Sequence, residues 1–106
     1  MDSSWQQLLA ASKDSLERIE LELAGLENLT PPQNQVMRAF QLPVREVRVL
    51  LLGQDPYPTE AMACGLAFAH SPGTKTPQSL KNMMKELESD IPSASAQGNL
   101  ASWSDQ

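Results

Sequence analysis

The sequence is poor in cysteine, in long apolar runs and in basic residues. Its single cysteine, Cys64, forms no internal disulfide, and no CxxC pair or Cys/His cluster offers the ligand spacing of a structural zinc site. No stretch approaches the roughly 20 apolar residues of a membrane-spanning helix, and the first residues carry acid and amide groups where a signal peptide has basic ones. We therefore expect a cytoplasmic protein without a metal, a cofactor or a membrane partner.

The charge is acidic overall, with 13 Asp and Glu against 8 Lys and Arg and a net charge of −5. This balance argues against a protein that coats duplex DNA, because such binding depends on Lys and Arg neutralising phosphates. Residues 1–30 hold six acids and two bases, which is −4 of the total, whereas residues 70–85 hold Lys75, Lys81 and Lys85 and no acid. A local nucleic-acid site is therefore compatible with the acidic total.

A chain of 106 residues is one small domain at most. Apolar spacing and proline signals predict an amphipathic helix over 4–23, a short helix at about 32–41, a helix from Pro77 to near Pro92, and the possible start of a fourth at Leu100. Residues 92–99 are expected to be a loop.

The run Val-Arg-Val-Leu-Leu-Leu at 47–52 ends at Gly53 and is typical of a strand buried on both faces, as in parallel sheets. Residues 65–69 are either a short strand or an ordered turn. Because a lone strand cannot pair its own backbone groups, either 65–69 is a weak neighbour or the sequence is the first part of a longer domain. The expected fold class is α/β, a three-layer α/β/α arrangement with a parallel sheet, of which only the N-terminal part is present.

The loop Gln54-Asp55-Pro56-Tyr57-Pro58 follows this predicted strand directly. Ligands of α/β folds bind beyond the carboxyl ends of strands, and the two prolines hold Asp55 and Tyr57 in extended conformations. The loop is thus a candidate site. A rigid turn in which Asp55 is a solvated or capping acid remains an alternative.

Residues 53–57, GQDPY, resemble the GQDPYH signature of the family 1 uracil-DNA glycosylases, with Pro58 in place of histidine as in actinobacterial members. Further motifs are similar at matching spacing: Ala63-x-Gly65-Leu66-x-Phe68, Pro77-x-Ser79-Leu80-x-Asn82, Lys85-Glu86-Leu87 and Gly98-x-Leu100 with Trp103. The resemblance covers roughly 34–106. It implies that 1–106 is an incomplete single domain, with an acidic helical segment at 1–30 and the N-terminal part of the glycosylase α/β domain at 31–106.

The resemblance implies a base-excision repair hydrolase that removes uracil from single- or double-stranded DNA by hydrolysing the N-glycosidic bond after base flipping. In this family pattern Asp55 matches the catalytic carboxylate, which stabilises positive charge on the sugar and positions a water. Gln54, Tyr57 and Phe68 match the residues that bind the base: a loop contact to a uracil carbonyl, a wall that excludes the thymine methyl, and a stacking ring. Without the motif, Phe68 is an ordinary core aromatic.

Pro77 and Ser79 match the family's DNA-phosphate contacts, at a helix start where free N–H groups favour an anion. A capped surface helix with solvated lysines is the alternative. His70 is expected to be a surface histidine or one with satisfied hydrogen bonds. No metal or cofactor is implied, and the complete protein is expected to be a monomer.

The sequence also departs from the family pattern. Residues 59–62, Thr-Glu-Ala-Met, replace a stretch with two glycines, and Glu60 adds negative charge near the expected DNA path. The family's later Asn and His-Pro-Ser motifs are absent, so we expect this chain to be inactive by itself. A non-catalytic nucleic-acid-binding or interaction module is the alternative. An unrelated nucleotide-binding protein lacks support, because the sequence has no GxxxxGK[ST] or GxGxxG loop.

Overall fold

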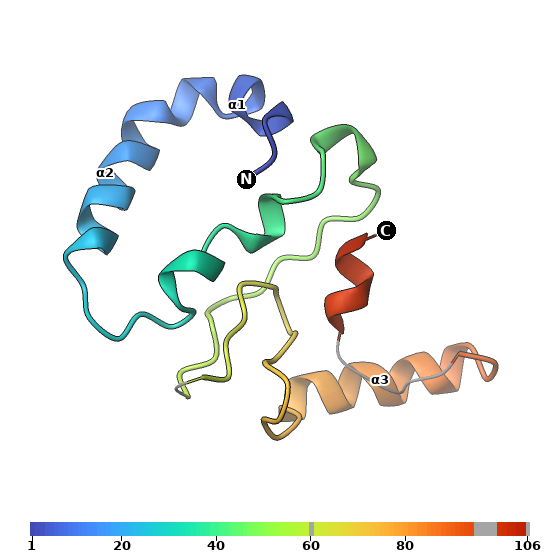
Figure 1. Cartoon of the computed structure of the whole chain (residues 1–106). Helices are drawn as coiled ribbons and strands as arrows, with labels where there is room; N and C mark the ends of the chain where they lie inside the picture. Colours follow the sequence, from blue (N-terminus) through green and yellow to red (C-terminus); the bar gives the residue numbers. More distant parts are fainter. Residues whose placement is uncertain (60, 95–99, 106) are drawn as a thin grey trace.

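The computed structural model describes residues 1–59, 61–94 and 100–105, and these form helices joined by long loops (Figure 1). The α-helices of this part are α1 (Ser4–Leu8), α2 (Lys13–Ala24) and α3 (Gln78–Asp90). The 3-10 helices are η1 (Ala10–Ser12), η2 (Gln33–Gln35), η3 (Arg38–Phe40), η4 (Val44–Glu46) and η5 (Leu100–Asp105). No described helix is long and apolar enough to cross a membrane.

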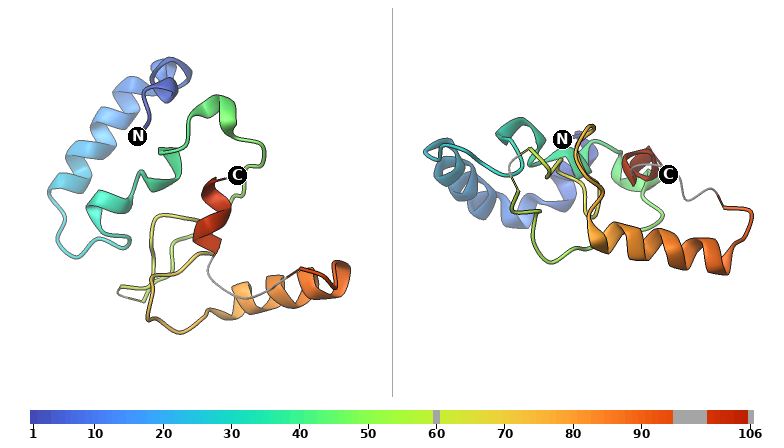
Figure 2. Two further views of the ribbon diagram at one scale, coloured as in Figure 1. Left: turned by 45° about the vertical axis from the view of Figure 1, so that its right-hand side comes forward. Right: turned by 90° about the horizontal axis from the view of Figure 1, so that it is seen from below.

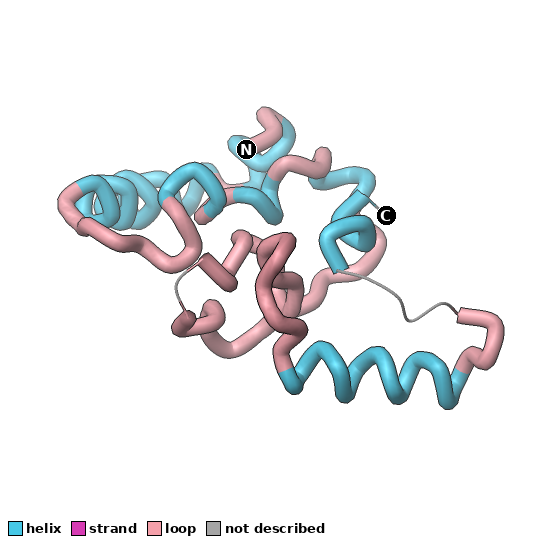
Figure 3. Tube along the Cα trace, turned by 60° about the horizontal axis from the view of Figure 1, so that its bottom comes forward, coloured by secondary structure: helices cyan, strands magenta, loops and turns pink. Residues whose placement is uncertain are grey.

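The predicted parallel sheet is wrong for this chain, because the described residues contain no β-strand (Figure 3). Residues 47–52 leave η4 in an extended conformation, with φ −69° and ψ 115° at Val47, but none of them is assigned to a strand. Residues 65–68 form bends and turns, and no residue of 65–69 is assigned to a strand either. A strand exists only through hydrogen bonds to another strand, so the apolar run stays an extended loop. The α/β expectation is therefore replaced by a helix-and-loop structure.

The predicted helix over 4–23 is broken into α1, η1 and α2. Between α1 and α2 the main-chain hydrogen bonds run to the third residue back, the 3-10 pattern, as in the Ser12 N–H donating to the Leu9 carbonyl at 2.9 Å. In α2 the pair Lys13–Glu17 lies at 3.6 Å with both side chains in solvent, which contributes little to stability. Ile19 remains exposed on the apolar face. Figure 1 shows α2 at the edge of the molecule, at the opposite end from α3.

The N-terminal residues are tied to the segment after η3. The Trp5 indole N–H donates to the Leu42 carbonyl at 2.8 Å, and the Trp5 ring packs edge-on against Phe40, with ring centroids 4.9 Å apart. The Val44 N–H donates to the Ser4 hydroxyl at 2.9 Å. These contacts join residues that lie 37 to 40 positions apart in the sequence.

The short helix predicted at 32–41 is replaced by η2 and η3. Their main-chain bonds run to the third residue back, as in Gln35 N–H to Pro32 O at 2.7 Å and Phe40 N–H to Met37 O at 3.1 Å. The chain therefore turns twice here instead of running straight.

The helix α3 is confirmed, with Pro77 at its N-cap position and Asp90 as its last residue. The predicted start of a helix at Leu100 is the 3-10 helix η5. In the predicted loop over 92–99, residues 95–99 lie outside the described residues, and Gly98 of the matched motif lies there too.

The buried core is small and lies where α3 and η5 meet the loop at 63–70. Its buried apolar residues are Ala63, Cys64, Ala69, Leu80 and Leu100. The radius of gyration is 15.5 Å, against about 13 Å for a compact domain of 100 residues. The molecule measures 46 × 33 × 19 Å and is visibly flat in the right-hand view of Figure 2. Much apolar surface consequently faces solvent.

Candidate active site

The loops at 53–58 and 63–69 enclose a hollow of about 630 Å³ next to the start of α3. Five of the sequence-predicted site residues line it: Gln54, Asp55, Tyr57, Phe68 and Ser79. The sixth, Pro77, is not among the lining residues and forms the N-cap of α3. Three segments separated in the sequence therefore bring the matched residues to one place.

The carboxylate of Asp55 is held by its neighbour. The Gln54 side-chain amide donates from Nε2 to Asp55 Oδ2 at 2.9 Å, and both residues are exposed. The loop thus presents a negatively charged group at the rim of the hollow.

The Tyr57 hydroxyl joins all three segments of the hollow. It donates to the Phe68 carbonyl at 3.1 Å, and it lies 3.1 Å from the Ser79 hydroxyl oxygen. A tyrosine hydroxyl has one proton, so with that proton directed to Phe68 the Ser79 hydroxyl is the donor to Tyr57. This network fixes the tyrosine ring against α3 and against the loop that carries Phe68.

The main chain of Phe68 adopts φ 60°, in the left-handed region that bulky residues rarely enter. Such a conformation persists only where surrounding contacts enforce it, and it is concentrated at functional sites. Here one of these contacts is the hydrogen bond that the Tyr57 hydroxyl donates to the Phe68 carbonyl.

Two further residues, Arg38 and Gly65, join the loop at 63–69 to the segment at 35–38. The Arg38 guanidinium donates from Nη1 to the Cys64 carbonyl at 3.1 Å. Gly65 has φ +77°, and a Cβ there would meet the Gln35 carbonyl and lie 2.9 Å from Arg38 Cβ. In the sequence, Gly65 was only part of a motif, and neither Gly65 nor Arg38 was predicted to have a role at the site. The signal that points to them is that both lie within 34–106, the range that resembles the family.

The loop at 59–62 lacks the glycines of the family pattern, and one of its residues holds a backbone conformation that favours glycine. Ala61 adopts φ 60°, again in the left-handed region that glycine enters at no steric cost. The turn is closed by the Met62 N–H donating to the Thr59 carbonyl at 3.1 Å. Glu60 lies outside the described residues.

His70 is buried and does not line the hollow. Its Nδ1 lies 2.9 Å from the Thr74 hydroxyl, which itself donates to the Ser71 carbonyl at 2.6 Å. Since the threonine proton is used there, the histidine Nδ1–H is the donor to Thr74. The expectation of a histidine with satisfied hydrogen bonds is confirmed.

The start of α3 is polar and free of acids. No side chain caps the helix at Pro77, and Ser79 is exposed in its first turn. Lys75, Lys81 and Lys85 are all exposed on or beside the helix. The described residues contain no group of three His, Cys, Asp or Glu side chains placed to hold a metal ion.

The chain is similar to DNA glycosylases. The relatives are curated uracil-DNA glycosylases: the one from Corynebacterium glutamicum is 43% identical over 102 residues, covering 92% of this chain and 40% of the relative. Uracil-DNA glycosylase 1 of Streptomyces avermitilis is 45% identical, covering 83% of the chain and 40% of the relative. The Aliivibrio fischeri enzyme is 36% identical over the whole chain and 51% of its own length.

The resemblance found in the sequence motifs is thus confirmed, and the matched region is the N-terminal portion of these relatives. The chain spans about half the length of the curated relatives it matches. No family model and no solved structure matches it.

Proposed function

We propose that this chain supplies the N-terminal part of a uracil-DNA glycosylase, with the hollow between 53–58, 63–69 and α3 forming one side of the pocket for a flipped uracil. The observation that carries the proposal is the hollow itself. It gathers Gln54, Asp55, Tyr57 and Phe68, the four residues matched to catalysis and base binding, within about 630 Å³. That volume is within the usual range of small-molecule sites.

Asp55 would act on the sugar. As the N-glycosidic bond lengthens, positive charge develops on the deoxyribose, and a carboxylate beside it lowers the energy of that state. The same group can orient a water molecule for attack at the anomeric carbon. The hydrogen bond from Gln54 restricts the orientation of the Asp55 carboxylate by donating to one of its oxygens.

Tyr57 and Phe68 would shape the space for the base. Tyr57 is a wall that leaves no room for the methyl group of thymine, and its bonds to Phe68 and Ser79 restrict how far the ring can move aside. Phe68 would stack on the flipped base, a contact of about 1–3 kcal/mol in single-strand binders.

The start of α3 would receive the DNA backbone. Ser79 and the uncapped N–H groups after Pro77 favour a phosphate, with the exposed lysines of 70–85 nearby. For that contact the Ser79 hydroxyl would redirect its proton from Tyr57 to a phosphate oxygen. The proposed partner is uracil-containing DNA, single- or double-stranded. The complete protein would be a cytoplasmic monomer.

The test joins this chain to the portion of the Corynebacterium glutamicum relative that it does not match and measures uracil release from single-stranded uracil DNA. We expect release, and we expect Asp55→Asn to lower turnover by about 10²–10⁴-fold while DNA binding stays nearly unchanged. Asp90→Asn is the matched control, since Asp90 is an exposed acid at the far end of α3. Equal turnover by Asp55→Asn and the parent would sink the role of Asp55.

A second candidate function is a non-catalytic nucleic-acid-binding module, which is favoured by the exposed Lys75, Lys81 and Lys85 beside an acid-free helix start. The 106-residue chain alone is expected to release little or no uracil. Binding of single-stranded DNA without uracil release, weakening with salt, would favour this module. Robust release by the isolated chain would exclude it.

A further inference from the structure

We propose that Arg38 is a positioning residue of the candidate site, which holds the loop at 62–71 so that the Phe68 ring lies where it can stack on a flipped base. The stacking role of Phe68 rests on the function proposed above, whereas the contact of Arg38 with the loop stands on the structure alone. Positioning of this kind decides how well the base is bound, and it leaves the bond-breaking step to other residues.

The loop is held at its ends and at two points between them. A main-chain hydrogen bond from the Ser71 N–H to the Met62 carbonyl, at 2.9 Å, joins the two ends. Inside the loop, the carbonyls of Cys64 and Phe68 each accept a hydrogen bond from a side chain of another segment. Arg38 provides the first of these bonds from its Nη1, at 3.1 Å. The guanidinium therefore fixes the part of the loop that leads into the proposed stacking ring.

The main chain of the loop needs such an anchor. Phe68 has φ 60°, a conformation that a bulky residue keeps only where surrounding contacts enforce it. Gly65 has φ +77°, and it packs so closely on the segment before it that a Cβ there would lie 2.9 Å from Arg38 Cβ. Removing an anchor lets the main chain relax toward ordinary conformations, and the Phe68 ring moves with it.

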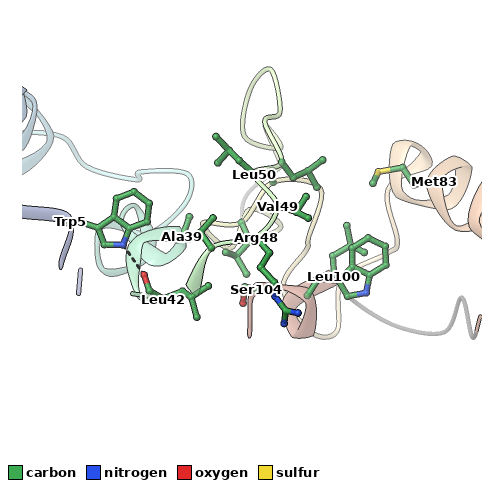
Figure 4. A pocket seen from close by; sticks show the side chains of 14 residues that line it. Trp5, Ala39, Leu42, Arg48, Val49, Leu50, Met83, Leu100 and Ser104 are labelled. Atoms are coloured by element: carbon green, nitrogen blue, oxygen red, sulfur yellow. Dashed lines mark hydrogen bonds between the residues drawn. The ribbon is translucent and has the colours of Figure 1, made fainter. Parts of the chain in front are cut away.

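The chemistry and the place of Arg38 suit this task. A guanidinium is always charged, and its hydrogen bond to a carbonyl is stronger than a bond between neutral groups. Cys64, whose carbonyl it holds, is only 2% exposed, so little water competes for the bond. Arg38 lines neither the hollow of the candidate site nor an apolar groove of about 550 Å³ whose wall includes the next residue, Ala39 (Figure 4). It therefore acts through the loop and not on the base.

The first experiment uses the full chain, with its single cysteine as the reporter. Cys64 is buried, so a maleimide reaches its thiol when the loop opens. We expect Arg38→Met, which keeps a long side chain but removes the donors, to speed labelling about tenfold or more, at a rate that low urea leaves unchanged, as for a local opening. Arg18→Met is the matched control, because Arg18 lies on α2 with 74% of its side chain exposed, and it should label like the parent. Equal labelling rates for the two variants overturn the proposal.

The second experiment separates positioning from stability in the joined polypeptide described above. We expect Arg38→Met to raise KM for single-stranded uracil DNA about tenfold, as loss of a base-stacking contact would, with kcat within about twofold of the parent. A smaller folded fraction would instead lower the apparent kcat and leave KM unchanged, and that result overturns the proposal. So does a weaker dependence of binding on salt, because it would mean that Arg38 contacts a DNA phosphate directly.

Arg38→Lys is the conservative variant, since it keeps a charged donor without the guanidinium fork. Its labelling rate and its KM should both lie between those of the parent and of Arg38→Met. If Arg38→Met does not fold, Arg38→Lys takes its place in both experiments, with an expected change of about threefold. A joined polypeptide that releases no uracil with Arg38 in place refutes the function proposed above, and the labelling rates still decide whether Arg38 holds the loop.

Discussion

Replacing Gly65 by alanine tests whether η2 and η3 truly support the candidate site. The alanine would pay about 1–2 kcal/mol for holding a left-handed conformation at φ +77°. Its methyl group would also collide with the Gln35 carbonyl and crowd Arg38 Cβ at 2.9 Å, and overpacking of this kind costs about 1–3 kcal/mol. Together, Gly65→Ala should lower the free energy of unfolding by about 2–5 kcal/mol.

Gly73 provides the matched control because it isolates the conformational cost. It has φ +81°, and a Cβ there would meet no atom within 4 Å. Gly73→Ala should therefore cost only about 1–2 kcal/mol. The assay is urea unfolding of each variant followed by tryptophan fluorescence, with the denaturant slope checked for constancy. Equal midpoints for Gly65→Ala and Gly73→Ala would refute the close packing of Gly65 on the segment before it.

Three further substitutions probe other contacts. Tyr57→Phe removes the hydroxyl that bonds to Phe68 and Ser79, so unfolding should be easier by about 1 kcal/mol in thermal or urea melts while the ring remains; an unchanged midpoint would show that the bonds do not form. Ala61→Gly relieves a left-handed alanine and should raise stability by about 1 kcal/mol; a lower melting temperature would contradict this. The Ser4 hydroxyl and amide hold the pKa of Asp2 below 3.8. Stability from that contact is present above pH 3.8 and is lost as the pH falls through the lowered pKa, and Ser4→Ala should raise the Asp2 pKa toward 3.8 in an NMR titration.

The helix α3 was predictable because its signals are local. Pro77 supplies the start, and Leu80, Met83 and Leu87 share one face at helical spacing, with Leu80 fully buried. Helix 4–23 was less predictable. Its apolar spacing continues through Leu9, but the hydrogen bonds change there to the 3-10 pattern, and the residues themselves carry no marker of that change.

The run 47–52 shows why the sheet prediction failed. Its side chains are suited to burial, and the sequence pattern records that suitability. Whether they are buried depends on other segments, and within the described residues 44–78% of each side chain at 49–52 stays exposed. An apolar run thus indicates that a segment is suited to burial, but it does not show whether other segments are present to bury it.

The residues of the candidate site were predictable from the sequence, but the hydrogen bonds between them were not. The motif grouped Gln54, Asp55, Tyr57 and Phe68, and these line one hollow. The bond between Tyr57 and Ser79 spans 22 positions, and it depends on how the loop returns to α3. Such a contact follows from three-dimensional packing, which no local pattern encodes.

The contacts that join Trp5 to Leu42 and Ser4 to Val44 close a loop of nearly forty residues, with α2 near its middle. Loop closure has a cost that rises slowly with length, by about 0.6 kcal/mol for each doubling. Residues inserted between α2 and η2 would therefore change stability little and would leave both ends of the loop in place. Residues 25–27, directly after α2, are a suitable point for a fluorophore or an affinity tag, because they do not line the hollow.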